Sequence, residues 1–130
     1  MTDPSDRLRQ HPDERFEPAV HQLDLSASAG ALLAEPLPAN RSHRQETLYR
    51  RGPVTVALFL FERGAGLPPH RAEGVVTVQV LSGRIRMSAE GKSYELSAGQ
   101  MLVMAPGVQH DVQAEESSRM LLTVCLEPKV

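Results

Sequence analysis

Short apolar runs separated by turns occupy the chain from about residue 40 to its end. Most of the turns contain glycine, as in Ser82-Gly83 and Glu90-Gly91. Runs of this length at this spacing are typical of the strands of a β-sandwich or barrel. The expected strands are 44–50, 54–62, 75–81, 84–89, 92–96, 101–104, 109–113 and 119–126. The pattern therefore predicts one all-β domain over residues 39–130.

A short helix is expected ahead of this domain, with Ser26 as its N-cap and its end near residue 34. The residues that would share its apolar side are Leu25, Ala29, Leu32 and Leu33. Prolines at 36 and 38 end the helix, because proline disfavours a helical residue before it. We assign 23–38 to this helix and its linker. Residues 1–22, polar and without a sustained period, are expected to form an extended N-terminal arm that is available to a partner subunit.

Two of the expected strands, 54–61 and 101–104, are apolar at almost every position. A strand of this kind is covered on both faces. In a small barrel one face meets the interior, so the other must meet the helix, the arm or a second copy of the chain. A homodimer is the simplest explanation.

Composition limits the classes of function. The chain has 130 residues, a net charge of −2 and no tryptophan, so direct nucleic-acid binding is not expected. Its apolar runs are too short to cross a bilayer, and no secretory signal is visible at the N-terminus. The single cysteine, Cys125, has no internal disulfide partner and is expected to be buried and inert. These features together favour a cytoplasmic protein.

Two histidines about forty residues apart, His70 and His110, each stand beside a turn rich in glycine and proline. Two imidazoles brought to one place in a barrel would begin a metal site, because neutral imidazole is a common ligand for transition metals. Glu73 could fold inward as a further ligand, although a solvated loop carboxylate is the simpler interpretation. His43 lies in a polar run, where a surface histidine is the default.

The ordered set of these turns and histidines resembles the cupins, specifically the small single-domain type, over about residues 45–126. The residues that match the two cupin motifs are Gly64, His70 and Gly83, followed by Gly99, Gly107 and His110. The resemblance implies a double-stranded β-helix, or jelly-roll barrel. It also implies a metal site of three histidines and a glutamate, but Ala72 and Val76 stand where the second histidine and the glutamate belong. The four-ligand site is therefore absent.

Two functions remain open. One is a barrel that binds a small organic molecule, either for sensing or sequestration or as a regulatory module acting through a partner protein. The other is a metal-dependent enzyme of dioxygenase or isomerase type, with Fe, Mn, Ni, Cu or Zn held by His70, His110 and a further ligand such as Glu73, water or substrate. The residues expected to form the pocket are His70, His110, Leu67, Val76, Val78 and Met104.

Overall fold

A computed structural model describes residues 18–39 and 42–128. One helix, α2 (Leu25–Leu33), precedes nine strands in this part of the chain. The strands are β1 (His43–Arg51), β2 (Val54–Phe61), β3 (Gly66–His70), β4 (Gly74–Ser82), β5 (Arg84–Ala89), β6 (Lys92–Ser97), β7 (Met101–Met104), β8 (His110–Ala114) and β9 (Ser118–Leu126). The all-β class with a short N-terminal helix is confirmed, and each strand expected from the sequence is present with ends shifted by at most one residue.

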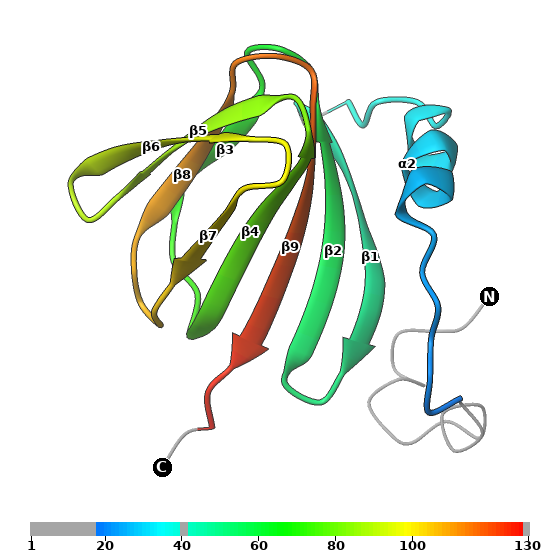
Figure 1. The fold of residues 1–130 in the computed structure, drawn as a ribbon, viewed down its shortest axis with the longest axis horizontal. Helices are drawn as coiled ribbons and strands as arrows, with labels where there is room; N and C mark the ends of the chain where they lie inside the picture. The colour runs from blue at the N-terminus through cyan, green and yellow to red at the C-terminus, as the bar shows by residue number, and fades with distance from the viewer. Residues whose placement is uncertain (1–17, 40–41, 129–130) are drawn as a thin grey trace.

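The strands form two antiparallel sheets, one with the order β1-β2-β9-β4-β7 and the other with the order β3-β8-β5-β6. Figure 1 shows the two sheets facing each other, with α2 lying beyond β1 at the side of the five-stranded sheet. The chain passes repeatedly from one sheet to the other, since β2, β4, β7 and β9 belong to the five-stranded sheet and β3, β5, β6 and β8 to the four-stranded sheet. This is the double-sheet jelly roll that the sequence predicted.

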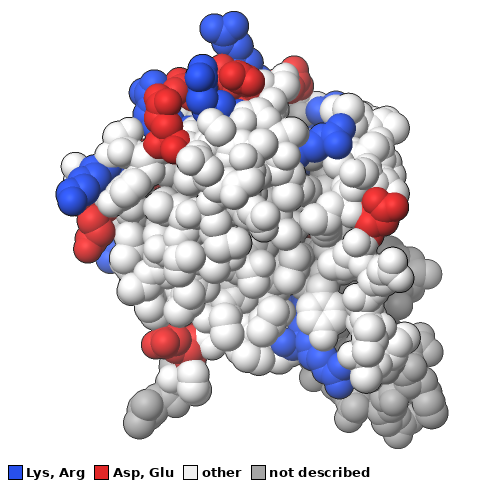
Figure 2. All heavy atoms as spheres, in the orientation of Figure 1, with Lys and Arg blue, Asp and Glu red and all other residues white. Residues whose placement is uncertain are grey.

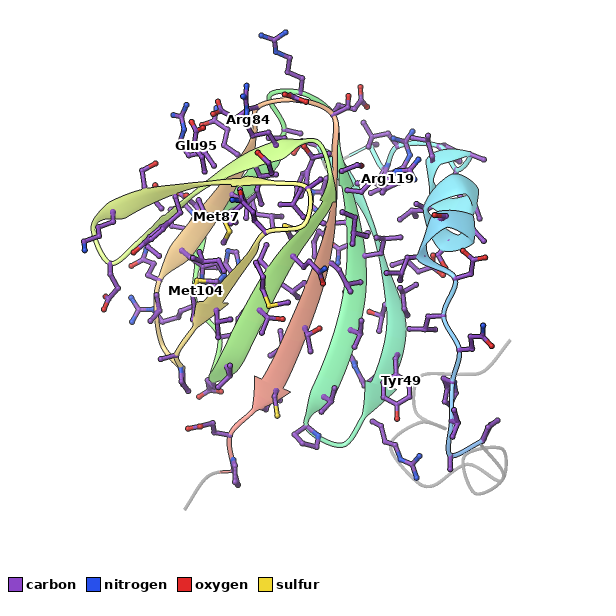
Figure 3. All side chains as sticks on the ribbon, viewed as in Figure 1. Tyr49, Arg84, Met87, Glu95, Met104 and Arg119 are labelled. Atoms are coloured by element: carbon purple, nitrogen blue, oxygen red, sulfur yellow. The ribbon has the colours of Figure 1, made fainter. Side chains whose placement is uncertain are left out.

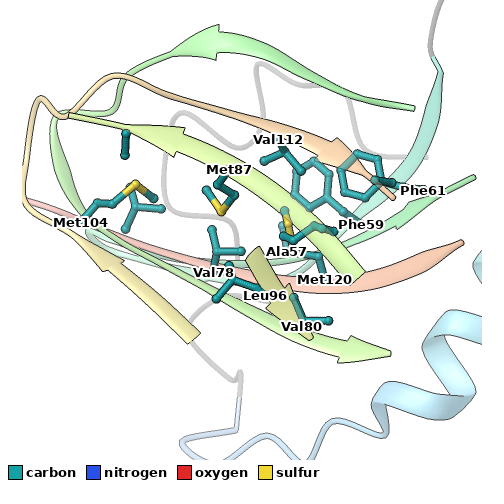
Figure 4. Close-up of a cluster of buried hydrophobic side chains, with 14 residues drawn as sticks. Ala57, Phe59, Phe61, Val78, Val80, Met87, Leu96, Met104, Val112 and Met120 are labelled. Carbon is teal, nitrogen blue, oxygen red and sulfur yellow. The ribbon is translucent and has the colours of Figure 1, made fainter. Parts of the chain in front are cut away.

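The core lies between the sheets and is made of aliphatic, methionine and phenylalanine side chains (Figure 4). Residues from both sheets contribute, and the most deeply buried include Val78, Val80, Ile85, Met87 and Met120. Strict alternation along β4 and β5 places every second residue inside, as the pleat of a half-buried strand requires.

Helix α2 begins two residues earlier than expected, and its N-cap is Asp24 rather than Ser26. The Asp24 carboxylate accepts a hydrogen bond of 2.9 Å from the Ala27 backbone N–H. An aspartate satisfies the first free N–H groups of a helix as well as a serine does, so the choice of cap was wrong while the helix itself was correctly predicted.

The helix explains why β2 is apolar at almost every position. Ala57, Phe59 and Phe61 face the barrel core, whereas Leu58 and Leu60 face outward and pack against the helix. Strand β7 differs, because its outward-facing Met101 and Val103 are 50% and 61% exposed. Cover on both faces is therefore confirmed for β2 but not for β7 within the single chain.

The sequence predicts a buried Cys125, but the residue is exposed, because it faces outward near the end of β9. The arm predicted at 1–22 falls largely on residues 1–17, which lie outside the described residues. No helix in the described part of the chain is both long and apolar enough to span a membrane.

Strand β3 was not expected from the sequence. It contains Pro68 and Pro69, which cannot donate backbone hydrogen bonds and so argued against a strand. The structure accommodates them because β3 is an edge strand whose pairing with β8 is interrupted between Leu67 and His70. This edge strand ends at His70, one of the two histidines singled out by the sequence.

Candidate functional site

The last residue of β3, His70, is paired directly with the first residue of β8, His110. Their imidazole ring centroids are 4.2 Å apart, and the planes meet edge to face at 65°. His110 is buried, with 3% of its surface exposed, whereas His70 is exposed. The fold thus brings together the two histidines that the sequence singled out, at one end of the barrel.

Backbone carbonyls fix the orientation of both rings. The Nδ1 atom of His70 lies 2.8 Å from the carbonyl oxygen of Pro68, and Nδ1 of His110 lies 3.0 Å from that of Val108. A carbonyl oxygen can only accept, so Nδ1 must carry the proton and donate. In the neutral rings, both Nε2 atoms are therefore left with a free lone pair.

The environment of His110 favours its neutral form. Burial lowers the pKa of His110 from its ordinary value of 6.5, and the charge of the neighbouring His70 lowers it further. The hydrogen bond to the Val108 carbonyl and the nearby Asp111 carboxylate act in the opposite direction, without overcoming burial. At neutral pH the ring is uncharged, as a hydrogen-bond acceptor or metal ligand must be.

A hollow of about 350 Å³ opens beside His110. Its lining residues are Pro69, Ser88, Ala89, Glu90, Gly91, Gln109, His110 and Asp111. Among the described residues, the only buried side-chain nitrogen or oxygen without a hydrogen-bond partner is Nδ1 of His43. The Nε2 atom of His110, which has no partner in that part of the chain, is therefore reached by solvent.

The remaining residues predicted for the pocket lie deeper. Val76, Val78 and Met104 belong to the packed core, with 3%, 0% and 5% of their surfaces exposed, whereas Leu67 is half-buried. Figure 4 shows Val78 and Met104 among the core side chains. Met104 also borders a smaller hollow of about 220 Å³ beside β6 and β7. A ligand in the first hollow would meet the histidine pair before it met these apolar side chains.

The site keeps two of the four metal ligands that the resemblance to cupins implied, His70 and His110. Glu73 is exposed on the loop after His70, and no three His, Cys, Asp or Glu side chains come together in the described residues as metal ligands would. Ala72 and Val76 carry no donor atom. The chain therefore offers two imidazoles, which is fewer than the three protein ligands usual for a catalytic zinc. The role of Glu73 stays a prediction.

A third histidine, His43, is buried although the sequence favoured a surface position. It faces the core from β1, with its ring centroid 5.5 Å from those of both Phe59 and Phe61. Its Nε2 atom lies 2.7 Å from the side-chain oxygen of Gln45 and donates to it. Strand alternation was the signal that could have found this residue, because His43 and Gln45 alternate with charged Arg44.

Two antiparallel sheets around one apolar core, with paired histidines at one end, define a jelly-roll barrel. The sequence profile of the family described as Cupin domain matches residues 57–126, which is more than half of the chain. This protein therefore belongs to the cupin family.

Solved structures support the same fold. A conserved protein of unknown function from Streptococcus pyogenes, SPY1581, is 26% identical with a TM-score of 0.68, over 87% of this chain and 92% of that one. A cupin 2 conserved barrel domain protein from Leptotrichia buccalis is 27% identical with a TM-score of 0.63, over 73% of this chain and 45% of that one. An RmlC-like cupin from Desulfovibrio desulfuricans, 23% identical with a TM-score of 0.64 over 84% and 97% of the two chains, shares the fold. No curated protein matches the chain.

Proposed function

We propose that this protein binds a small organic molecule at the His70–His110 pair, in a sensing or sequestration role. The observation that carries the proposal is the contact of the two imidazole rings, whose Nδ1 atoms are fixed by backbone carbonyls, with His110 in the lining of a 350 Å³ hollow. Pockets of about this size are typical of small-molecule sites, and polar groups fixed in position provide their specificity.

The chemistry of the hollow favours a ligand that carries hydrogen-bond donors. Neutral His110 accepts at Nε2, and the carboxylates of Glu90 and Asp111 lie in the same lining. The Asp111 carboxylate already accepts the Ser88 backbone N–H at 2.9 Å, which holds it in place. An acceptor-rich site of this kind suits a hydroxyl-bearing or amine-bearing molecule better than a carboxylate or phosphate.

A ligand-observed NMR screen of sugars, polyols and amines tests this proposal. We expect compounds that bind the wild-type protein to lose binding in the His70→Ala/His110→Ala double variant. The His21→Ala variant, which removes a histidine elsewhere in the chain, should retain binding. Hits that bind all three proteins equally would contradict the proposed site.

A metal-dependent enzyme is a second candidate, and one observation favours it. Histidines that ligate metals commonly donate their other ring nitrogen to a backbone carbonyl, as both His70 and His110 do. A bound metal would polarise a substrate oxygen, with water or the substrate completing the shell. Near-stoichiometric Fe, Mn, Ni, Cu or Zn in the purified protein, lost together with turnover in the double variant, would favour this candidate over simple binding.

We further propose that the protein is a homodimer formed through the outer face of the five-stranded sheet. Figure 2 shows the centre of this face without charged side chains, and the exposed Met101 and Val103 of β7 lie at its edge. Exposed apolar surface of this kind is typical of protein contacts.

A reducing, cytoplasmic location is part of the same proposal and is consistent with the lone, exposed Cys125.

A further inference from the structure

The outer face of the barrel carries a second cavity, away from the histidine pair. It has a volume of about 510 Å³ and lies between the end of α2 and the five-stranded sheet. Its lining residues are Leu33, Arg44, Leu60, Phe61, Glu62, Ser82, Ser117, Ser118 and Arg119. A neighbouring hollow of about 300 Å³ continues it along the helix and shares Ser82 and Arg119 with it. We call the two together the helix groove.

Apolar side chains form part of the groove wall. Leu60 is buried beneath the helix, and Leu33, the last residue of α2, is 53% exposed. Leu25 and Leu81 continue the apolar lining in the neighbouring hollow. An apolar molecule lying along the groove would cover surface that the single chain leaves partly open to water, which is favourable.

The two arginines of the groove have different surroundings. Arg44 is engaged, since its Nε donates to the Glu35 carbonyl at 2.9 Å and its guanidinium lies 3.8 Å from the Glu62 carboxylate. Arg119 faces outward from β9, opposite Leu60 of β2 and Ser82 of β4. It has no hydrogen-bond or ion-pair partner anywhere in the described part of the chain.

Arg119 is also half-buried, and Figure 3 shows it between β9 and α2. A guanidinium that has lost part of its water without gaining a carboxylate is an unsatisfied site for an anion. Exposed hydroxyls of Ser82 and Ser117 in the same lining can donate further hydrogen bonds to an anionic oxygen.

We infer that the helix groove binds an amphipathic monocarboxylate, with its carboxylate on Arg119 and its apolar chain along α2. The chemistry is the opposite of that at the histidine pair, where the lining presents acceptors and acidic groups. The inference is therefore independent of the proposed function, and either site can exist without the other.

Octanoate and 1-octanol are suitable probes, because they share an apolar chain and differ in the carboxylate. We expect octanoate to bind at least about tenfold more tightly than octanol, a difference of ~1.4 kcal/mol. The measurement is a ¹H–¹⁵N NMR titration below the concentration at which octanoate forms micelles. Amide shifts should concentrate at α2, Leu60 and Arg119, and His110 should be unaffected.

Two charge-removing variants separate a specific contact from general attraction. Arg119→Gln should abolish the preference for octanoate. Arg51→Gln should keep it, because Arg51 lies in β1 of the same five-stranded sheet but does not line the groove. A third variant, Leu33→Gln, should weaken both probes. The inference would be overturned if the wild-type protein bound the two probes equally or bound neither. It would also be overturned if Arg119→Gln and Arg51→Gln had equal effects. Shifts centred on His110 would likewise overturn it.

Discussion

Two backbone carbonyls determine which nitrogen of each site histidine is free. Because Pro68 and Val108 accept from Nδ1, neither ring can flip without losing a hydrogen bond. The sequence indicated the two histidines through their turns and spacing. It could not indicate the tautomers, since these depend on where the backbone places the carbonyls of Pro68 and Val108.

Protonation of His110 should make stability depend on pH. The pKa of His110 is lowered in the folded protein and returns to about 6.5 on unfolding. As the pH falls through 6.5 the unfolded chain binds the proton first, so the free energy of unfolding decreases until the pH is below the folded pKa. Each unit by which the pKa is lowered corresponds to about 1.4 kcal/mol.

Urea denaturation of the wild-type protein and of His110→Gln between pH 7.5 and 5 measures this effect. The variant should lose less stability than the wild type over this interval. Identical pH profiles, or a wild-type protein that becomes more stable as the pH falls, would show that His110 is not held in its neutral form.

Two substitutions of the buried His43 should change the stability of the protein in opposite directions. His43→Phe removes the unpartnered Nδ1 and keeps the contacts with Phe59 and Phe61, while exposed Gln45 can turn to water. We expect a change between zero and about 1 kcal/mol of added stability. His43→Ala leaves a cavity and should cost about 3 kcal/mol. Thermal or chemical unfolding checks both, and a strongly destabilised His43→Phe would mean that the nitrogen has a partner.

Among the secondary-structure elements, hydrophobic patterning was informative wherever a strand lies inside a sheet. The alternation in β4 and β5 and the continuous apolar run of β2 were sufficient to place them. The pattern was insufficient for β3, where two prolines occupy an edge position, and it did not indicate that His43 at the start of β1 is buried. Both exceptions lie at the sheet edges, where pairing on one side leaves the composition of a strand less constrained.

Close approach of β4 to β9 depends on a glycine. A Cβ atom at Gly74 would collide with the Cys125 carbonyl and the Leu126 backbone, whereas one at Gly30 in α2 would meet no atom within 4 Å. We therefore expect Gly74→Ala to destabilise the protein by about 1–3 kcal/mol. Gly30→Ala should stabilise it by about 0.5–1 kcal/mol, since alanine favours helix. Equal effects of the two in chemical denaturation would contradict the observed strand spacing.

At the level of the whole molecule, the apolar interior is filled by side chains, and the polar chemistry lies at one end and on the outer face. The sequence indicated the barrel and the histidine pair but placed Val76, Val78 and Met104 in an open pocket. Those residues pack in the core because the methionines Met87 and Met120 occupy the space between the sheets. The sequence alone does not show which side chains face one another across the two sheets, so it could not predict that they fill the interior.

Assembly through the five-stranded sheet gives a prediction for the intact protein. Val103→Glu places a charge on the exposed face of β7, and we expect it to convert a dimer to a monomer in analytical ultracentrifugation. Ser93→Glu, exposed on β6 of the other sheet, is the matched control and should leave the dimer unchanged. A wild-type monomer, or a Val103→Glu dimer as stable as the control, would contradict this arrangement.

The most direct test of the site is ¹⁵N NMR of the imidazole nitrogens at pH 7.5. The structure predicts that His70 and His110 carry their proton on Nδ1 and present an unprotonated Nε2, with His110 remaining neutral to a pH below 6.5. A proton on Nε2 of His110, or a charged His110 ring at pH 7.5, would mean that no lone pair faces the hollow. The histidine pair would then not be the recognition site proposed here.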